Sequence, residues 1–143
     1  DDKMKPFTQP LYDNFEKILS NSYVESMIKK ELIQIVPLAY MRGRTFEDKF
    51  IIADEMQNAS IEQMVMLMTR IGKGSKLIII GDPTQCDRKM KSNGLADLVN
   101  RIKNSSNELN HIKLITLENK DIQREAVVRE VINKIYNDMP NRR

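Results

Sequence analysis

The sequence is poor in the residues that form disulfides and zinc sites. Its 143 residues include one cysteine, Cys86, and one histidine, His111. A disulfide within the chain requires two cysteines, and a clustered zinc site requires several cysteine or histidine ligands. Both are therefore excluded, and a lone cysteine is compatible with a protein of the reducing cytoplasm.

Long hydrophobic runs are also missing. No apolar stretch approaches the roughly 20 residues that a helix needs to cross a bilayer. Hydrophobic residues make up 41% of the chain and charged residues 30%, a balance that excludes a disordered tail. The net charge is only +3, so charge alone does not indicate nucleic-acid binding. The composition predicts one soluble domain over residues 1–143.

Short apolar runs that alternate with helical patterns indicate an α/β fold. Two central runs are apolar throughout, which is typical of parallel strands covered by helices on both faces. In all, the pattern predicts strands at Leu32–Val36, Phe50–Ala53, Leu77–Ile80 and Ile112–Leu117.

Apolar residues recur with helical spacing between and around these runs. One helix is predicted from Ile61, after the capping-box pair Ser60 and Gln63, to about Arg70, with Gly72 as a left-handed cap. It completes a strand, helix, strand unit. Further helices are predicted around Leu95–Ile102 and Val128–Ile135, and in the first thirty residues after turns at Pro6 and Pro10, with Leu11, Phe15, Ile18 and Leu19 buried.

Two adjacent carboxylates, Asp54 and Glu55, follow the first central strand in the segment FIIADEMQN. In open α/β sheets, ligands bind beyond the carboxyl ends of the strands. Desolvating two carboxylates there is unfavourable unless a cation or a donor network compensates, and Mg²⁺ with a phosphate chain is a common solution. The pattern is typical of a Walker B strand. The alternative is that the pair only ends a strand and caps the next helix.

The second central strand ends in GDPTQ, which favours the metal-and-phosphate hypothesis. Gly81 permits the close approach of a ligand. Gln85 offers an amide that can orient a water or a γ-phosphate oxygen. Because both strand ends belong to one sheet edge, we expect Asp82 and the Asp54–Glu55 pair to face the same crevice.

In series, these motifs resemble the PhoH-like proteins, a bacterial and phage family of P-loop ATPases related to superfamily one helicases and first associated with phosphate starvation. FIIADEMQN and LIIIGDPTQ look like helicase motifs two and three, and MRGRT, TRIGKGSK and GDPTQCD extend the similarity. The flanks DDKMKPFTQPLYDNF and DIQREAVVREVINKIY agree in order. The resemblance covers about Asp2–Tyr136 and implies a RecA-like P-loop NTPase core, a parallel sheet flanked by helices.

The resemblance also implies roles for residues at both strand ends. Asp54 would hold Mg²⁺, and Glu55 would be the catalytic carboxylate that activates water for attack on ATP. Gln85 would sense the γ-phosphate, and Asp82 would support its loop. Arg124 matches the late arginine of the family, whose helicase counterpart reaches the γ-phosphate, although the family's neighbouring His-Pro is absent here.

Two basic segments have alternative roles. By resemblance, the MRGRT segment would lie near the nucleotide, or its arginines brace their own loop against acidic neighbours. After GDPTQCD, a basic run stands where the family has Leu-Pro. This run either contacts the phosphate backbone of RNA or single-stranded DNA, or it is only a solvated loop. The residues concerned are Arg42, Arg44 and Thr45 in the first segment and Arg88, Lys89 and Lys91 in the second.

One family element is missing from the sequence. A P-loop needs Gly, four residues and then Gly-Lys-Ser/Thr, and no glycine here has another glycine five positions later. IGKGSK lacks this spacing and precedes a strand, whereas a P-loop follows one. Since the family's P-loop comes before the segment that matches Asp2 onward, we expect the carboxyl-terminal portion of a longer protein, incomplete at its N-terminal side.

Two classes of function stay open at this point. In the first, the chain contributes Walker B, the sensor glutamine and the late arginine to Mg-ATP hydrolysis in a complete ATPase, with RNA or single-stranded DNA as a partner. In the second, a truncated, non-catalytic domain keeps the fold to bind a partner or to assemble into a homo-oligomer. The ligands expected for the complete protein are ATP and Mg²⁺, whereas the isolated chain is expected to be inactive.

Overall fold

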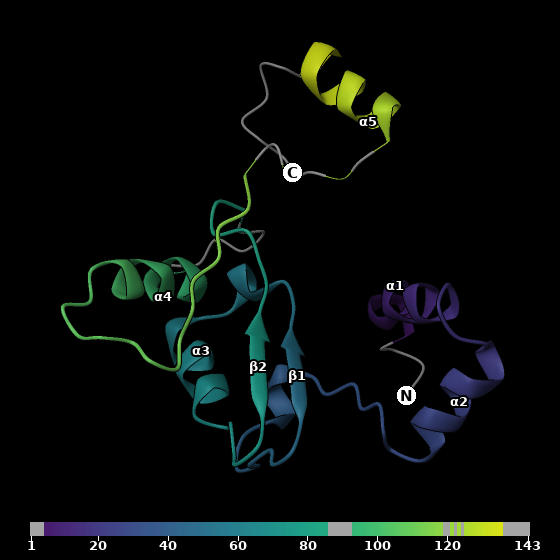
Figure 1. Ribbon diagram of the computed structural model, residues 1–143, viewed down its shortest axis with the longest axis horizontal. Coiled ribbons are helices and arrows are strands. Elements are labelled where there is room, and N and C mark those ends of the chain that lie inside the picture. The colour runs from purple at the N-terminus through teal and green to yellow at the C-terminus, as the bar shows by residue number, and fades with distance from the viewer. Residues whose placement is uncertain (1–4, 86–92, 119–120, 122, 124, 136–143) are drawn as a thin grey trace. The chain divides into compact units, whose positions relative to one another are not determined.

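The computed structural model describes residues 5–85, 93–118, 121, 123 and 125–135 (Figure 1). The chain folds as two compact units, Asp1–Arg42 and Gly43–Arg143. Their existence does not test the prediction of a single domain, which stays a prediction. Among the described residues, every helix is too short or too polar to cross a membrane.

The first unit contains the helices α1 (Lys5–Glu16) and α2 (Asn21–Lys29), followed by the 3-10 helix η2 (Leu38–Tyr40). The predicted turns at Pro6 and Pro10 are wrong, because both prolines lie within α1. Pro6 occupies the first turn, where backbone N–H groups have no helical partner in any case, but Pro10 forfeits one helical hydrogen bond. The predicted buried stripe is also wrong: Leu11 is 42% exposed and Ile18 is 81% exposed, and Phe15 and Leu19 are only half-buried.

The second unit is built on two parallel strands, β1 (Phe50–Ala53) and β2 (Lys76–Ile79), paired from Phe50 with Lys76 to Ala53 with Ile79. The helix α3 (Ile61–Met68) connects them. The sequence therefore predicts this strand, helix, strand unit correctly, and the α/β fold with a parallel sheet flanked by helices is confirmed.

Two features of the predicted sheet are wrong. Leu32–Val36 and Ile112–Leu117 are not strands, since neither segment pairs with a neighbouring strand in the described part of the chain, and Ile115 is 70% exposed. In addition, burial alternates along both strands, and Phe50 is 64% exposed. One face of the described strand pair is thus half-buried and the other is exposed, whereas continuous apolar runs predict two covered faces.

The capping box of α3 is present as the sequence predicts. The Ser60 hydroxyl accepts from the Gln63 N–H at 3.2 Å, and the Ser60 N–H donates to the Gln63 side-chain oxygen at 2.9 Å. The predicted cap at Gly72 is wrong, because the helix ends earlier, at Met68. Gly72 instead lies against the backbone of Phe46, where a Cβ would be 2.7 Å from the carbonyl oxygen, and its neighbour Gly74 has a positive φ.

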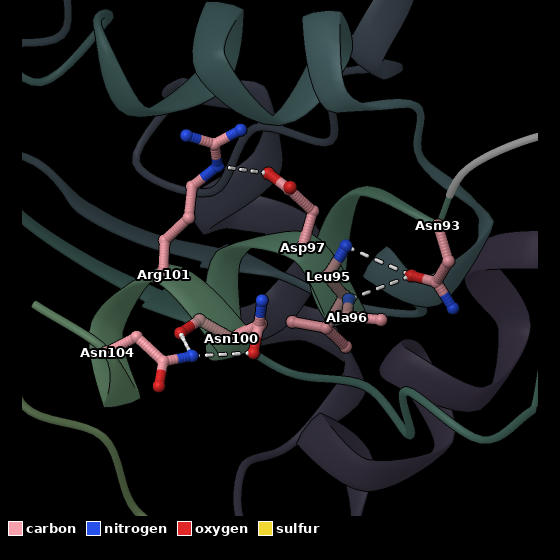
Figure 2. Close-up of polar contacts among 7 residues, drawn as sticks. All are labelled: Asn93, Leu95, Ala96, Asp97, Asn100, Arg101 and Asn104. Atoms are coloured by element: carbon pink, nitrogen blue, oxygen red, sulfur yellow. Dashed lines mark hydrogen bonds and ion pairs between the residues drawn. The ribbon is translucent and has the colours of Figure 1, made fainter.

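The helix α4 (Gly94–Lys103) packs against α3 and against the 3-10 helix η3 (Met56–Asn58). The side chain of Asn93 caps α4 by accepting from the N–H groups of Leu95 and Ala96 (Figure 2). Along the helix, Asp97 pairs with Arg101 at 2.7 Å, and this contact raises the pKa of Arg101 (Figure 2).

A small apolar core joins these elements, and its fully buried side chains are Met64 and Leu67 of α3. The buried Met56, Ala59 and Leu95 extend it from η3 to α4. The helix predicted around Val128–Ile135 is present as α5 (Ala126–Glu130), which continues as the π-helix η5 (Val131–Ile135).

Gly94→Ala tests the close approach between α4 and the start of α3. A Cβ at Gly94 would lie 2.5 Å from the Ser60 carbonyl oxygen and 2.9 Å from that of Ala59. We expect a loss of about 1–3 kcal/mol in the free energy of unfolding in urea, although helix propensity alone favours alanine by about 1 kcal/mol. Asn100→Ala, on the exposed side of α4, should stay within about 0.5 kcal/mol. A stabilised Gly94→Ala variant would contradict the packing.

Candidate functional site

The carboxyl ends of β1 and β2 lie side by side. The Ile80 N–H donates to the Ala53 carbonyl at 2.8 Å, and the Met56 N–H donates back to the Ile80 carbonyl at 3.1 Å. These two hydrogen bonds therefore join the residues that end and follow β1 to the residue that follows β2. As a result, Asp54 and Glu55 meet the loop that begins at Gly81.

The two adjacent carboxylates are exposed and differ in backbone conformation. Glu55 has φ 54° and ψ 34°, the left-handed region, which costs a non-glycine residue about 1–2 kcal/mol. The Asp54 Oδ1 accepts from the Glu55 N–H at 2.9 Å and so supports the turn. In an extended strand, the side chains of neighbouring residues point to opposite faces. Glu55 lies beyond β1 in a left-handed turn, so here the turn sets the direction of its side chain relative to that of Asp54.

Gln57 connects the two strand ends, and sequence reasoning missed it as a site residue. Its side chain is only 5% exposed. The Nε2 group donates to Glu55 Oε2 at 2.5 Å, and Oε1 accepts from the Asp82 N–H at 3.3 Å. The available signal was an amide two positions after the acid pair in FIIADEMQN, at the end of a strand.

Gly81 makes room for this amide. A Cβ at position 81 would lie 2.5 Å from Gln57 Oε1 and 2.8 Å from Leu95 Cδ2. The sequence predicts a close approach at this glycine, with a ligand as the neighbour. In the described residues, the groups that approach it are the Gln57 side chain, Leu95 of α4 and the backbone N of Met56.

Asp82 organises the loop that contains Gln85. Its Oδ1 accepts from the Thr84 N–H at 2.9 Å and from the Thr84 hydroxyl at 2.6 Å, and its Oδ2 accepts from Gln85 Nε2 at 3.1 Å. The Pro83 carbonyl in turn accepts from the Asn93 side chain at the start of α4, at 3.1 Å. The side-chain amide of Gln85 is therefore held beside the strand ends.

Arg44 and Thr45 of the MRGRT segment do not join this group. Arg44 lies over the ring of Phe46 at 4.8 Å, and its carbonyl faces Arg70 Nη1 at 3.5 Å. Phe46 pairs with Ile71, just before the strands begin, so Arg44 and Thr45 lie at the opposite end of the strands from Asp54. Arg42 is the exposed last residue of the first unit.

Four predicted site residues lie outside the described residues. They are Arg124, the late arginine, and the basic run of Arg88, Lys89 and Lys91. Their predicted roles stay predictions.

The acid pair offers the kind of ligand that Mg²⁺ prefers. The described residues contain no cluster of three or more His, Cys, Asp and Glu side chains that could hold a metal ion. Mg²⁺ commonly takes one or two carboxylates and completes its shell with water and phosphate oxygens. Two exposed carboxylates at a strand end fit such an ion together with a phosphate ligand.

Asp82→Ala tests the organisation of the Gln85 loop. The variant removes three hydrogen bonds to a half-buried carboxylate, so we expect a loss of about 1–3 kcal/mol in unfolding free energy. The NMR side-chain amide signals of Gln85 should also move to the positions of a free glutamine. Asp97→Ala, which breaks only the exposed pair with Arg101, should cost no more than about 0.5 kcal/mol. Unchanged Gln85 signals would contradict the assignment.

Comparison with known proteins agrees with this arrangement of motifs. The family model for PhoH-like proteins matches residues 1–137. A PhoH-like protein of Bacillus subtilis is 39% identical over 132 residues, which are 92% of this chain and 40% of that protein. Protein PhoH of Escherichia coli K12 is 40% identical over 103 residues, 70% of this chain and 29% of that protein.

The match runs along nearly the whole sequence, as the motif resemblance predicts. The chain itself spans 40% or less of the length of these two relatives. Both strand ends described above, FIIADEMQN and GDPTQ, fall within the matched residues. The chain belongs to the family of PhoH-like proteins.

Proposed function

We propose that this chain supplies part of an ATP-hydrolysing site, namely the residues that bind the metal ion and activate the attacking water. The observation that carries the proposal is the meeting of two strand ends. There, the exposed carboxylates of Asp54 and Glu55 lie beside the loop that holds Gln85. Gln57 joins the two sides through hydrogen bonds. Ligands of open α/β sheets bind at this edge.

Each residue of the proposed site has a part that suits its chemistry. Mg-ATP, when bound, supplies the phosphoryl group and the charge of the metal. Asp54 holds the metal, since Oδ1 is used by the Glu55 N–H and no described residue donates to Oδ2. Glu55 accepts the proton of the attacking water, and Gln85 orients a γ-phosphate oxygen. Arg124 adds positive charge by family resemblance alone.

The proposed site is incomplete within these 143 residues. The sequence has no P-loop spacing, so nothing in it cradles the phosphate chain as a Walker A motif does. The related proteins are longer than this chain, which covers 40% of the Bacillus subtilis protein. We place the phosphate cradle in sequence outside these residues. Coupling to RNA or single-stranded DNA would be a further step, and its basic residues, Arg88, Lys89 and Lys91, are outside the described part.

The missing cradle predicts that the isolated chain binds Mg-ATP weakly. A cradle contributes about five charge-assisted contacts of roughly 1.5 kcal/mol each, which is close to the whole free energy of micromolar binding, about 8 kcal/mol. Calorimetry on the 143-residue chain should therefore give a dissociation constant no better than about 1 mM, without hydrolysis above background. Micromolar binding, with turnover that Glu55→Gln abolishes, would show that another cradle exists within the chain.

The two carboxylates should have separable effects in a longer PhoH-like protein that carries this chain together with a Walker A segment. Asp54→Asn should weaken Mg²⁺-dependent nucleotide binding about tenfold or more, because it removes charge from the metal shell. Glu55→Gln should keep the affinity and lower single-turnover hydrolysis by about 100-fold or more, because an amide cannot accept the proton of the water.

Glu47→Gln is the matched control for this pair of variants, since Glu47 is an exposed acid before β1, at the other end of the strands. It should change neither affinity nor hydrolysis. Equal loss of affinity in both variants, or normal hydrolysis in Glu55→Gln, would show that the two carboxylates are structural.

A further inference from the structure

We propose that Gln57 is a positioning residue that holds the Glu55 carboxylate in register with the Gln85 loop, so that the two strand ends act as one unit. The inference deepens the proposed function and rests on it. It assigns a role to a buried side chain that the motif resemblance leaves without one.

The chemistry of its two partners allows one orientation of the Gln57 amide. A carboxylate such as Glu55 only accepts hydrogen bonds, and a backbone N–H such as that of Asp82 only donates. The NH₂ group must therefore face Glu55 and the carbonyl oxygen must face Asp82, as the 2.5 Å and 3.3 Å contacts show. With 5% of the residue exposed, water has little access to replace either bond.

The packing around Gln57 holds the amide in place. Gly81 lies so close that a Cβ would be 2.5 Å from Gln57 Oε1. The neighbouring Met56 is buried, and its N–H is fixed to the Ile80 carbonyl. A glutamine between a glycine, a buried methionine and the end of β2 has few rotamers available. A displacement of one of its hydrogen-bond partners would therefore displace the other.

Glu55 is a side chain that needs such a partner. It is exposed, and its backbone turns in the left-handed region, so neither burial nor a regular helix or strand directs its carboxylate. The hydrogen bond from Gln57 supplies that direction. Catalytic groups lose rate steeply when misplaced, by about 100-fold for an error near 1 Å.

The contacts continue beyond Gln57 into the loop after β2. Gln57 binds the backbone N–H of Asp82, and the carboxylate of Asp82 binds Gln85 Nε2. A movement of Gln85 on contact with a γ-phosphate would thus pass through Asp82 and Gln57 to Glu55. This route links the sensing of the phosphate to the placement of the base.

Hydrogen exchange on the 143-residue chain tests the contact without nucleotide. In Gln57→Met, the side chain keeps its size but cannot accept, so the Asp82 amide should exchange about tenfold faster. Gln57→Glu keeps an acceptor oxygen and should leave Asp82 protected. Gln63→Met, which removes the capping glutamine of α3, is the control for general loss of stability and should not affect Asp82 selectively. Unchanged exchange at Asp82 in Gln57→Met would overturn the inference.

Kinetics in the longer Walker A-containing protein test the positioning role. Both Gln57→Met and Gln57→Glu should lower kcat by about 10- to 100-fold, while the KM for ATP changes less than about threefold, since a methionine has no group that donates to Glu55 and an ionised glutamate would repel it. Gln63→Met should leave kcat near the wild-type value. A normal kcat in either Gln57 variant, or a parallel change of kcat and KM, would overturn the role.

Failure of the inference is distinguishable from failure of the proposed function. A longer wild-type protein that neither binds nor hydrolyses ATP would overturn the proposed function, and the positioning role with it. An active wild-type protein whose Gln57 variants are equally active would overturn the inference alone.

Discussion

The parallel pairing of β1 with β2 is the constraint on which the site depends. Asp54 and Asp82 are separated in sequence by a complete helix, and only the register from Phe50 with Lys76 to Ala53 with Ile79 brings the following residues together. Parallel strands also require a crossover connection, here α3, whose buried Met64 and Leu67 anchor it in the core. Loss of that packing would separate the two carboxyl ends before it altered any single site residue.

Local patterns predicted those parts of the fold that local interactions determine. Ser60 and Gln63 form the predicted capping box because both partners lie within one turn. Phe50–Ala53 is a strand as predicted, and α4 contains the expected apolar stripe around Leu95 and Ile102. Asp54, Glu55, Asp82 and Gln85 were predicted in the same way, since each follows a strand whose apolar run is visible in the sequence, and their roles stay predictions.

The features that sequence reasoning missed depend on distant partners. An apolar run such as Ile112–Leu117 becomes a strand only if another strand pairs with it, and periodicity says nothing of the partner. Gly72 lies in a close contact with Phe46, 26 residues away, and is not the helix cap that its position after α3 suggests. Gln57 was missed for the same reason, because its two hydrogen bonds only exist once both strand ends are in place.

There is also a physical reason why the residue between the two strand ends, Gln57, has an amide side chain. A buried amide must satisfy both its donor and its acceptor, and an unpaired one costs about 1–3 kcal/mol, so Gln57 favours the arrangement that pairs Glu55 with the Asp82 loop. A lysine or arginine there would form an ion pair with Glu55 and lower the basicity of its carboxylate, and an acidic residue would repel it. A neutral amide binds one carboxylate oxygen of Glu55 and leaves the charge and the second oxygen exposed to solvent.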